Sequence, residues 1–200
     1  MHQILIVTSN RKKLKEMLDV FNLDYCKFLT LNDFPSINIV ENGETFFDNA
    51  LIKAKTAATK FNVISLGEDS GLVVDALNGK PGVYSHRFAG ETATDKQNNE
   101  LILSLLKDFP LEKRTAHFVS CVVLCSPDGR FITAEGRIDG IIIDEPKGEN
   151  GFGYDPIFYY PPLKKTFAEL TDEEKNRISH RKIAIEKIKP KLLDFLEGND

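Results

Sequence analysis

The pattern of apolar and polar residues predicts a mixed α/β chain that opens with a strand and a helix. An apolar run over residues 3–7 is typical of a buried strand, and over residues 14–21 the apolar spacing becomes helical. Residues 25–31 and 37–40 are then predicted to be extended.

A second helix is predicted to begin at Thr45, because Asp48 stands three residues later in a capping-box pattern. Its apolar residues recur at helical spacing, whereas Asn49 and Lys53 fall one turn apart on a different face. Lys53 can therefore point where the core residues do not. A third helix is predicted over residues 94–106.

The second half of the chain predicts a long hairpin followed by two helices. Residues 116–125 and 130–143 are expected to be its strands, on either side of a Pro-Asp-Gly turn. Thr171 with Glu174 marks the start of one helix. Ser179 is a candidate N-cap for the next, so a break of the chain is predicted there.

Pro190 falls within the last predicted helix and is expected to kink or end it. The chain shows no internal repeat, linker or low-complexity stretch, so residues 1–200 are predicted to form a single domain. Its composition, 42% apolar and 28% charged, is ordinary for soluble proteins and allows a substantial core.

The formal net charge of −4 argues against a broad nucleic-acid surface, since neutralising a phosphate backbone requires a basic face. Free nucleotides remain compatible because they need only a few local cations. No apolar run approaches the roughly eighteen residues of a membrane span, and the first residues show no cleavable signal. The protein is therefore expected to be cytoplasmic, with neither a nucleic-acid polymer nor a membrane as partner.

The three cysteines are predicted to be buried, reduced thiols. Cys121 and Cys125 lie four residues apart in a strand-like run, about 13 Å, which is too far for an intrachain bridge or a shared metal. Cys26 stands alone. The four histidines lack metal-ligand spacing, so no zinc site is predicted.

The start of the first helix is a candidate phosphate site. A strand that leads into a capped helix presents backbone N–H groups and the positive end of the helix dipole to an anion. Lys13 stands in the first turn, where its positive charge is unfavourable next to the positive end of the dipole. Helix stability therefore does not explain this lysine, whereas a bound phosphate would. An ordinary Ser or Asn N-cap is the simpler alternative. The candidate residues are Thr8, Ser9, Asn10, Arg11, Lys12 and Lys13.

Asp69 is a candidate metal ligand because it follows a strand-like run over residues 63–66, where a turn can aim a carboxylate into a cleft. A buried carboxylate needs a cation nearby. Mg²⁺ is typically held by one or two carboxylates plus substrate phosphates, so Asp69 with Glu41 would be sufficient. The simpler alternative is an Asx-turn made by Asp69 and Ser70.

Residues 151–181 combine glycines, aromatic rings, lysines and a His-Arg pair. Flat rings, hydrogen-bond donors and cations are what a nucleotide requires, although a polar surface loop running into a solvated helix is the alternative. The glycines lack the spacing of a dinucleotide fingerprint or a Walker motif. Ser70 lacks the flanking residues of a nucleophile elbow, so no covalent nucleophile is predicted.

Four motifs in order resemble the inosine triphosphate pyrophosphatase family over almost the whole chain. They are TSNRKKLKE at 8–16, ENGETFFDNALIKA at 41–54, EDSGLVVDALNGKPGVYSHR at 68–87 and the 151–181 stretch. The resemblance implies an α/β fold with a mixed, elongated central β-sheet, flanked by helices in two lobes with a nucleotide cleft between them. It also implies a homodimer.

The same resemblance implies Mg²⁺-dependent hydrolysis of ITP, dITP and XTP to the nucleoside monophosphate and pyrophosphate, which cleanses the nucleotide pool. Asp69 would hold Mg²⁺ with Glu41 and would also accept a proton from the attacking water, and whether it does one or both stays open. Lys13 and Lys53 would grip phosphates, and Ser70 would contact the substrate beside the metal.

For the base, the resemblance implies a ring platform at Phe152 and a pocket lined with donors. Inosine and xanthine carry a 6-oxo acceptor where adenine carries a 6-amino donor, so such a pocket would reject ATP. The implied base and sugar residues are Phe152, Gly153, Tyr154, Asp155, Lys175, His180 and Arg181. Glu68 stands where Asp is common in the family, and Arg87 is either structural or substrate-facing.

Two other functions remain possible. A pyrophosphatase for modified pyrimidine nucleotides would keep the metal site and lysines but change the base pocket, and the presence of Phe152, His180 and Arg181 disfavours it. A non-catalytic nucleotide sensor would be expected to have lost Asp69 or Lys13, and both are present.

Overall fold

The computed structural model describes residues 1–198, so the last two residues of the predicted domain lie outside it. Within this range seven strands form one sheet in the order β2-β1-β3-β4-β5-β6-β7. The strands are β1 (His2–Val7), β2 (Cys26–Thr30), β3 (Ser65–Val74), β4 (Thr115–Cys125), β5 (Phe131–Ile142), β6 (Phe158–Tyr160) and β7 (Lys165–Thr166). The helices are α1 (Arg11–Phe21), α2 (Phe46–Phe61), α3 (Asp95–Leu106), α4 (Asp172–Ile178) and α5 (His180–Glu197). The predicted mixed α/β class is confirmed.

The chain folds into two compact units built from alternating segments. The first unit takes residues 1–69, 120–136 and those from 180 on, and the second takes 70–119 and 137–179. Strands β3, β4 and β5 each contribute residues to both units. The single domain and the nucleotide cleft remain predictions. Among residues 1–198 there is no helix with the length and apolar character needed to cross a membrane.

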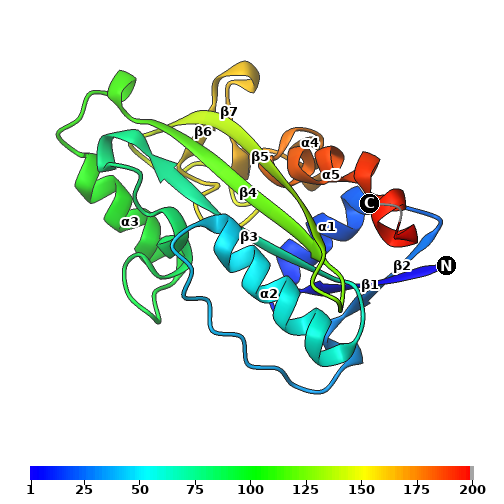
Figure 1. Cartoon of the computed structure of the whole chain (residues 1–200). Helices are drawn as coiled ribbons and strands as arrows, with labels where there is room; N and C mark the ends of the chain where they lie inside the picture. Colours follow the sequence, from blue (N-terminus) through cyan, green and yellow to red (C-terminus); the bar gives the residue numbers. More distant parts are fainter. Residues whose placement is uncertain (199–200) are drawn as a thin grey trace. The chain divides into compact units, whose positions relative to one another are not determined.

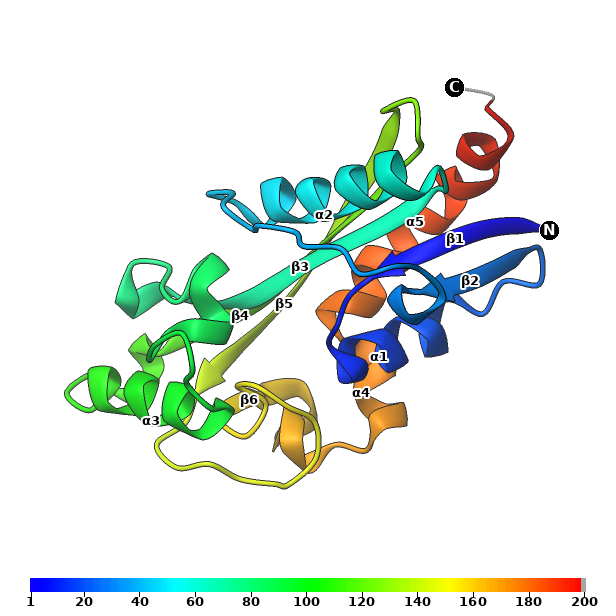
Figure 2. The same cartoon turned by 90° about the horizontal axis from the view of Figure 1, so that it is seen from below.

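In the first unit, helices cover both faces of the strands, with α2 on one side of β1 and β3 and α1 on the other (Figure 1, Figure 2). Ile4 and Ile6 of β1 pack with α1 and α5, whereas Leu5 and Val7 pack with α2. This division follows from the two-residue period of a strand. β1 pairs in parallel with both β2 and β3, as helical crossovers require.

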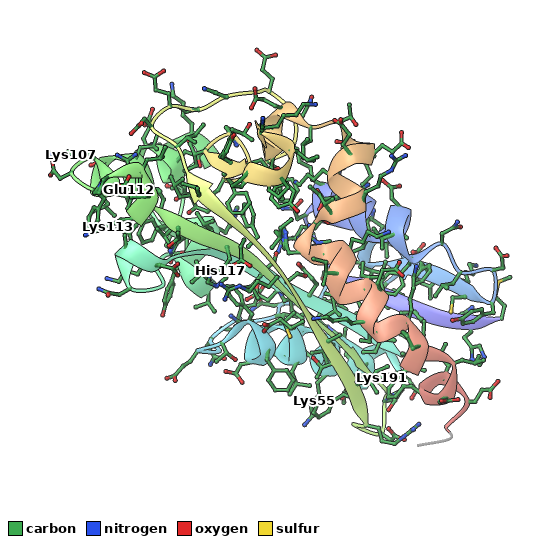
Figure 3. The ribbon with its side chains drawn as sticks, turned by 90° about the horizontal axis from the view of Figure 1, so that it is seen from above. Lys55, Lys107, Glu112, Lys113, His117 and Lys191 are labelled. Carbon is green, nitrogen blue, oxygen red and sulfur yellow. The ribbon has the colours of Figure 1, made fainter. Side chains whose placement is uncertain are left out.

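The second unit has its own core around β4, β6 and the chain after β7. Phe118, Phe158 and Phe167 stand at its centre, with ring centroids 4.5 to 5.7 Å apart. Ile102 and Leu106 of α3 belong to the same core. Figure 3 shows the charged side chains of Lys107, Glu112 and Lys113 gathered at the turn that follows α3. The hairpin predicted over residues 116–143 is confirmed by the adjacent strands β4 and β5.

The helix starts follow the predicted caps. Thr45 Oγ1 accepts from the N–H of Asp48 at 3.1 Å, and the Asp48 carboxylate accepts from the N–H of Thr45 at 3.1 Å. Thr171 and Glu174 form the same reciprocal pair at α4. Ser179 has an extended backbone and separates α4 from α5, so the predicted break is confirmed.

The turn predicted around Asp69 is wrong, because β3 continues through it from Ser65 to Val74. Gly67, two residues before Asp69 in this strand, allows close packing. A Cβ at Gly67 would lie 2.1 Å from the backbone oxygen of Ala50 in α2. Asp69 therefore projects from the middle of a strand against which α2 packs closely, and the Asx-turn alternative is also excluded.

Two further expectations differ from the structure, the first entirely and the second in part. Residues 37–40 form no strand; Ile37 and Ile39 pack against the core formed by β1 and α2, so their alternation reflects contact with that core. Pro190 lies inside α5, which continues to Glu197, so the helix does not end there; a kink at Pro190 stays a prediction. Ile188 and Leu192 on either side of the proline are fully buried, so core packing holds the helix together despite the missing N–H.

Candidate functional site

The predicted phosphate segment forms a capped helix start in the first unit. Asn10 Oδ1 accepts the N–H groups of Lys12 and Lys13 at 3.0 and 3.1 Å, and the Asn10 N–H donates to Thr8 Oγ1 at 3.1 Å. The simpler alternative, an ordinary Asn N-cap, therefore describes these local bonds. An anion here would have to share or displace the cap. The side chains of Ser9, Arg11 and Lys12 are exposed.

The Lys13 side chain enters a network of charges around Glu68. Lys13 Nζ lies 3.0 Å from Glu68 Oε2, while Arg181 Nη2 lies 3.0 Å from Glu68 Oε1. Ser120 donates to the same Oε1 at 2.9 Å, and Arg181 also pairs with Glu16. Because Glu68 and Arg181 are almost fully buried, each depends on these partners.

The ionisation of Glu68 follows from this network. Burial by itself would raise the pKa of Glu68, but the charges of Arg181, Lys13 and Lys53 outweigh it and hold that pKa well below 4.5. This arrangement is not predicted by the sequence motifs. Ser120, a hydroxyl inside the apolar run of β4, is the signal that could have indicated a buried polar partner.

A second cluster gathers around the ammonium group of Lys53. Lys53 Nζ lies 2.7 Å from Glu41 Oε2 and 3.5 Å from Asp69 Oδ1. Asn49 Nδ2 donates to Asp69 Oδ2 at 3.2 Å, and Asn49 Oδ1 accepts from the N–H of Gly43 at 2.8 Å. Asn49 thus ties the loop that carries Glu41 to Asp69.

The predicted helix face explains how this cluster forms. Lys53 is buried on α2, whereas Lys55, two residues later, is exposed and points outward (Figure 3). Asn49 precedes Lys53 by one turn, as predicted, and is also buried. Ser70, the neighbour of Asp69 on β3, is half-buried.

The charges in this cluster are unevenly compensated. Burial raises the pKa of Asp69 by more than Lys53 and Lys13 lower it. Burial also lowers the pKa of Lys53, but Asp69 and Glu41 outweigh that effect and raise it. The ammonium of Lys53 is closer to Glu41 than to Asp69, so Asp69 receives the weaker share of its charge.

These residues fit a magnesium ion that substrate phosphates would complete. The carboxylates of Glu41 and Asp69 lie 2.7 and 3.5 Å from Lys53 Nζ, so they are close enough to bind one cation together. In the described chain, no cluster of three or more His, Cys, Asp or Glu residues could hold a metal on its own. One or two carboxylates are the usual protein share of a magnesium site at phosphates.

The second unit contains an aromatic loop, residues 151–155, in which the side chain of Asp155 locks the backbone in place. Asp155 Oδ2 accepts the N–H of Phe152 at 2.8 Å and a proton of Lys175 Nζ at 2.6 Å. The Lys175 ammonium lies 4.6 Å from the centroid of the Phe152 ring, a cation–π contact. Gly151 has a φ of +73°, and a Cβ there would lie 2.1 Å from Asp155 Oδ2. Glycine is therefore required for this lock.

The next residues of the loop are anchored to other segments of the second unit. Tyr154 is buried and donates its hydroxyl proton to Ser85 O at 2.7 Å. Burial raises the pKa of Tyr154, so the phenol stays protonated. The N–H and C=O groups of Gly153 bond to Asp95 and Asn99 of α3. These two residues were also missed, although the buried Asn99 in a helix interior is an unfavourable choice and could have been a signal.

The predicted base-binding residues fall into two groups. Phe152, Gly153, Tyr154, Asp155 and Lys175 come together in the second unit. His180 and Arg181 belong to the first unit, at the buried start of α5. A Cβ at Gly136 would lie 2.0 Å from His180 O, so this glycine of β5 allows α5 to begin close to the sheet.

The fold and these clusters place the protein among α/β proteins of one family. The chain belongs to the Ham1 family, whose model matches residues 4–191. The resemblance inferred from the four sequence motifs is thereby confirmed.

Individual relatives are similar along nearly the whole chain. The dITP/XTP pyrophosphatase of Bacillus cereus is 43% identical over 201 residues, covering 99% of this chain and 98% of that protein. The dITP/XTP pyrophosphatase of Desulforamulus reducens is 47% identical over 186 residues, 92% of each chain. The solved HAM1 protein from Coxiella burnetii superimposes with a TM-score of 0.90 at 39% identity, covering 97% of this chain and all of that one (100%).

Proposed function

We propose that this protein hydrolyses ITP, dITP and XTP to the nucleoside monophosphate and pyrophosphate in a Mg²⁺-dependent reaction, and so clears non-standard purines from the nucleotide pool. Relatives similar over the whole chain are named dITP/XTP pyrophosphatase, which supports the proposal. The observation that carries it is the cluster in which Lys53 and Asp69 are buried together with Glu41 at their edge.

The proposed reaction uses this cluster for the phosphates. The oxygen of water forms a bond to the α-phosphorus, the bond from that phosphorus to the bridging oxygen breaks, and pyrophosphate leaves. Asp69 would accept the proton of the water, since burial raises its pKa toward the range useful to a base. The ammonium groups of Lys53 and Lys13, which are paired with carboxylates, would also bind phosphate oxygens of the substrate.

Magnesium, when bound, would neutralise phosphate charge and polarise the α-phosphate. Glu41 and Asp69 are the residues that would hold it. Asn49 would keep the Asp69 carboxylate oriented, because its amide proton already donates to Oδ2.

The proposed base site is the aromatic loop of the second unit. The ring of Phe152 would stack on the purine, and its backbone is held in place by the Asp155 lock. Lys175, which belongs to the same unit, would donate to the 6-oxo group, while the roles of His180 and Arg181 in base binding stay predictions from the sequence. A 6-amino group would leave such donors unpaired, which is the proposed reason for rejecting ATP.

Steady-state pyrophosphate release tests the proposal across ITP, dITP, XTP, ATP, GTP and a modified pyrimidine triphosphate. We expect kcat/KM for the first three to exceed that for ATP by about two to three powers of ten. Ribose and deoxyribose forms should differ little. A chelator should abolish release, and added Mg²⁺ should restore it.

A matched pair of lysines on α2 controls for general effects on the helix. Lys53→Ala should raise KM steeply for every nucleotide, whereas Lys55→Ala, which alters an exposed side chain, should not. Equal efficiency on ATP and ITP would indicate a general nucleotide pyrophosphatase. Preference for the pyrimidine, or binding without turnover, would favour the two alternative functions.

We also propose that the protein works in the cytoplasm as a homodimer. Cys26, Cys121 and Cys125 are buried and unbridged, which suits a reducing compartment. The dimer follows from the family resemblance. Sedimentation equilibrium should give about twice the chain mass of 22.5 kDa, and a monomer at assay concentration would contradict it.

A further inference from the structure

We propose that Asp95 and Asn99 of α3 are positioning residues for the purine site, acting through the backbone of Gly153. The N–H of Gly153 donates to Asp95 Oδ2 at 2.8 Å, and Asn99 Nδ2 donates to the C=O of Gly153 at 3.1 Å. Asp95 and Asn99 are four residues apart, so they share one face of the helix. This inference rests on the proposed function, because it concerns the loop that would bind the base.

The two bonds fix the chain immediately after the proposed stacking ring. The N–H of Phe152 is held by Asp155, and the polar groups of the next residue are held by α3. The backbone carrying the ring is therefore restrained on both sides. In Figure 2, α3 in green lies beside the yellow chain that precedes β6, which is the segment these bonds join.

Gly153 needs such restraint because of its conformation. Its φ is +60°, yet a Cβ there would meet no atom within 4 Å. Crowding therefore does not define the position of this residue. Glycine is also the residue with the greatest backbone freedom, so the loop has little intrinsic preference for the observed orientation. The hydrogen bonds from α3 supply it.

A comparison with the preceding residue argues against a purely stabilising role for Asn99. Asn98 uses both ends of its amide: Nδ2 donates to His86 O at 3.1 Å, and Oδ1 accepts from the N–H of Ala89 at 2.8 Å. Asn99 is equally buried, but its Oδ1 has no hydrogen-bond partner among residues 1–198. Burying an unsatisfied acceptor is unfavourable. The presence of a buried amide at Asn99 is therefore explained by its hydrogen bond to Gly153.

The test compares Asp95→Ala and Asn99→Ala with wild type and with Gln97→Ala. Gln97→Ala breaks the Thr94–Gln97 capping box at the same helix start and leaves Gly153 untouched. Steady-state kinetics give kcat and KM for ITP and ATP. Competition with inorganic tripolyphosphate gives the affinity for phosphates without a base.

We expect Asp95→Ala and Asn99→Ala to raise KM for ITP about tenfold to a hundredfold, as a misplaced binding group does, with kcat changed less than about twofold. The inhibition constant of tripolyphosphate should stay at the wild-type value. Asp95→Asn keeps an acceptor for the Gly153 N–H and should recover most of the loss. Gln97→Ala should lower the unfolding temperature without changing KM.

The outcomes separate this inference from the proposed function. If wild type does not prefer ITP over ATP, the proposed function fails. If wild type prefers ITP but both alanine variants keep its KM, the positioning inference alone is wrong. A tripolyphosphate constant that rises in step with KM would also overturn it, because the loss would then be general. Should Asn99→Ala fail to fold, the exposed Asp95 carries the test through Asp95→Ala and Asp95→Asn.

Discussion

Asp69 illustrates how the surroundings of one side chain set its chemistry. The carboxylate is buried in the middle of β3, accepts a hydrogen bond from Asn49 and shares the Lys53 ammonium with Glu41. Burial raises its pKa, which favours proton uptake, whereas a bound cation would lower it and favour ligation. Both assignments need the same ionised carboxylate, so one substitution tests whether it is essential.

Asp69→Asn is expected to abolish pyrophosphate release while leaving the fold intact, because asparagine has nearly the same shape but no charge. Unfolding by urea should show a midpoint close to wild type. Asp108→Asn, which neutralises an exposed carboxylate, should keep full activity. Glu41→Gln should raise the Mg²⁺ requirement more than it lowers the saturated rate. Near-normal turnover in Asp69→Asn with magnesium present would rule out the assignment.

Arg181 shows the opposite situation, in which a residue named for the base is committed elsewhere. Its side chain is almost fully buried, and its guanidinium pairs with both Glu16 and Glu68. Removing it would take a buried counter-charge away from both carboxylates, although Lys13 would still pair with Glu68. A change in base preference in Arg181→Ala could not be separated from damage to this network. Substitution of Phe152, whose ring is half-buried, tests base recognition more directly.

At the scale of elements, the contact between α2 and β3 depends on Gly67. A Cβ there would lie 2.1 Å from Ala50 O and 2.8 Å from the Ala54 nitrogen, and backbone atoms cannot move aside as a flexible side chain would. This contact holds Lys53 of α2 near Asp69 of β3.

Gly67→Ala is therefore expected to lower the free energy of unfolding by about 3 kcal/mol or more, at the upper end of overpacking effects. Activity should fall as well, because α2 and β3 must separate. Gly129→Ala in the hairpin turn is the control. Gly129 has a φ of +93°, and a Cβ added there would meet no atom within 4 Å, so the substitution adds only backbone strain. That strain should amount to about 1–2 kcal/mol, with activity retained. Urea titration and pyrophosphate release measure both, and equal losses in the two variants would contradict this account.

Elements with local signals were predictable from the sequence. The capping boxes at Thr45 and Thr171 and the break at Ser179 rest on contacts within four residues, so the sequence contains everything they need. The extent of β3 was not predictable in this way. The role of Gly67 depends on α2, which packs against it. A single sequence does not show whether a glycine permits a turn or the close approach of another backbone segment.

At the scale of the whole molecule, the motifs indicated which residues matter but not their partners. Lys53, Asp69 and Glu41 were predicted for one site and do converge on one charge centre. The pairing of Arg181 with Glu16 joins residues 165 positions apart, and no periodicity or spacing can report such a contact. Long-range ion pairs are fixed by the tertiary fold, which explains why the role of Glu68 was missed.

The Glu68 network should make the stability of the protein sensitive to acid. It connects α1, β3, β4 and α5 through Lys13, Glu68, Ser120 and Arg181, and so joins elements from both ends of the chain. In the folded state the pKa of Glu68 lies well below 4.5, its ordinary value. As the pH falls below about 4.5, Glu68 becomes protonated in the unfolded chain while it is still ionised in the folded chain. The free energy of unfolding therefore decreases with falling pH in that range, and the contribution is fully present above it.

Urea midpoints measured from pH 6 to pH 3 on wild type and Glu68→Gln test this expectation. Glu68→Gln should be less stable at pH 6 by about 3–5 kcal/mol, because the buried Arg181 and the half-buried Lys13 lose this carboxylate as a partner. Its midpoint should also fall less steeply with acid, since the titrating group is gone. Other carboxyls are common to both proteins and cancel in the difference between the two slopes. Glu112→Gln, at an exposed position (Figure 3), should keep the wild-type slope. Identical slopes for wild type and Glu68→Gln would show that the acid sensitivity arises elsewhere.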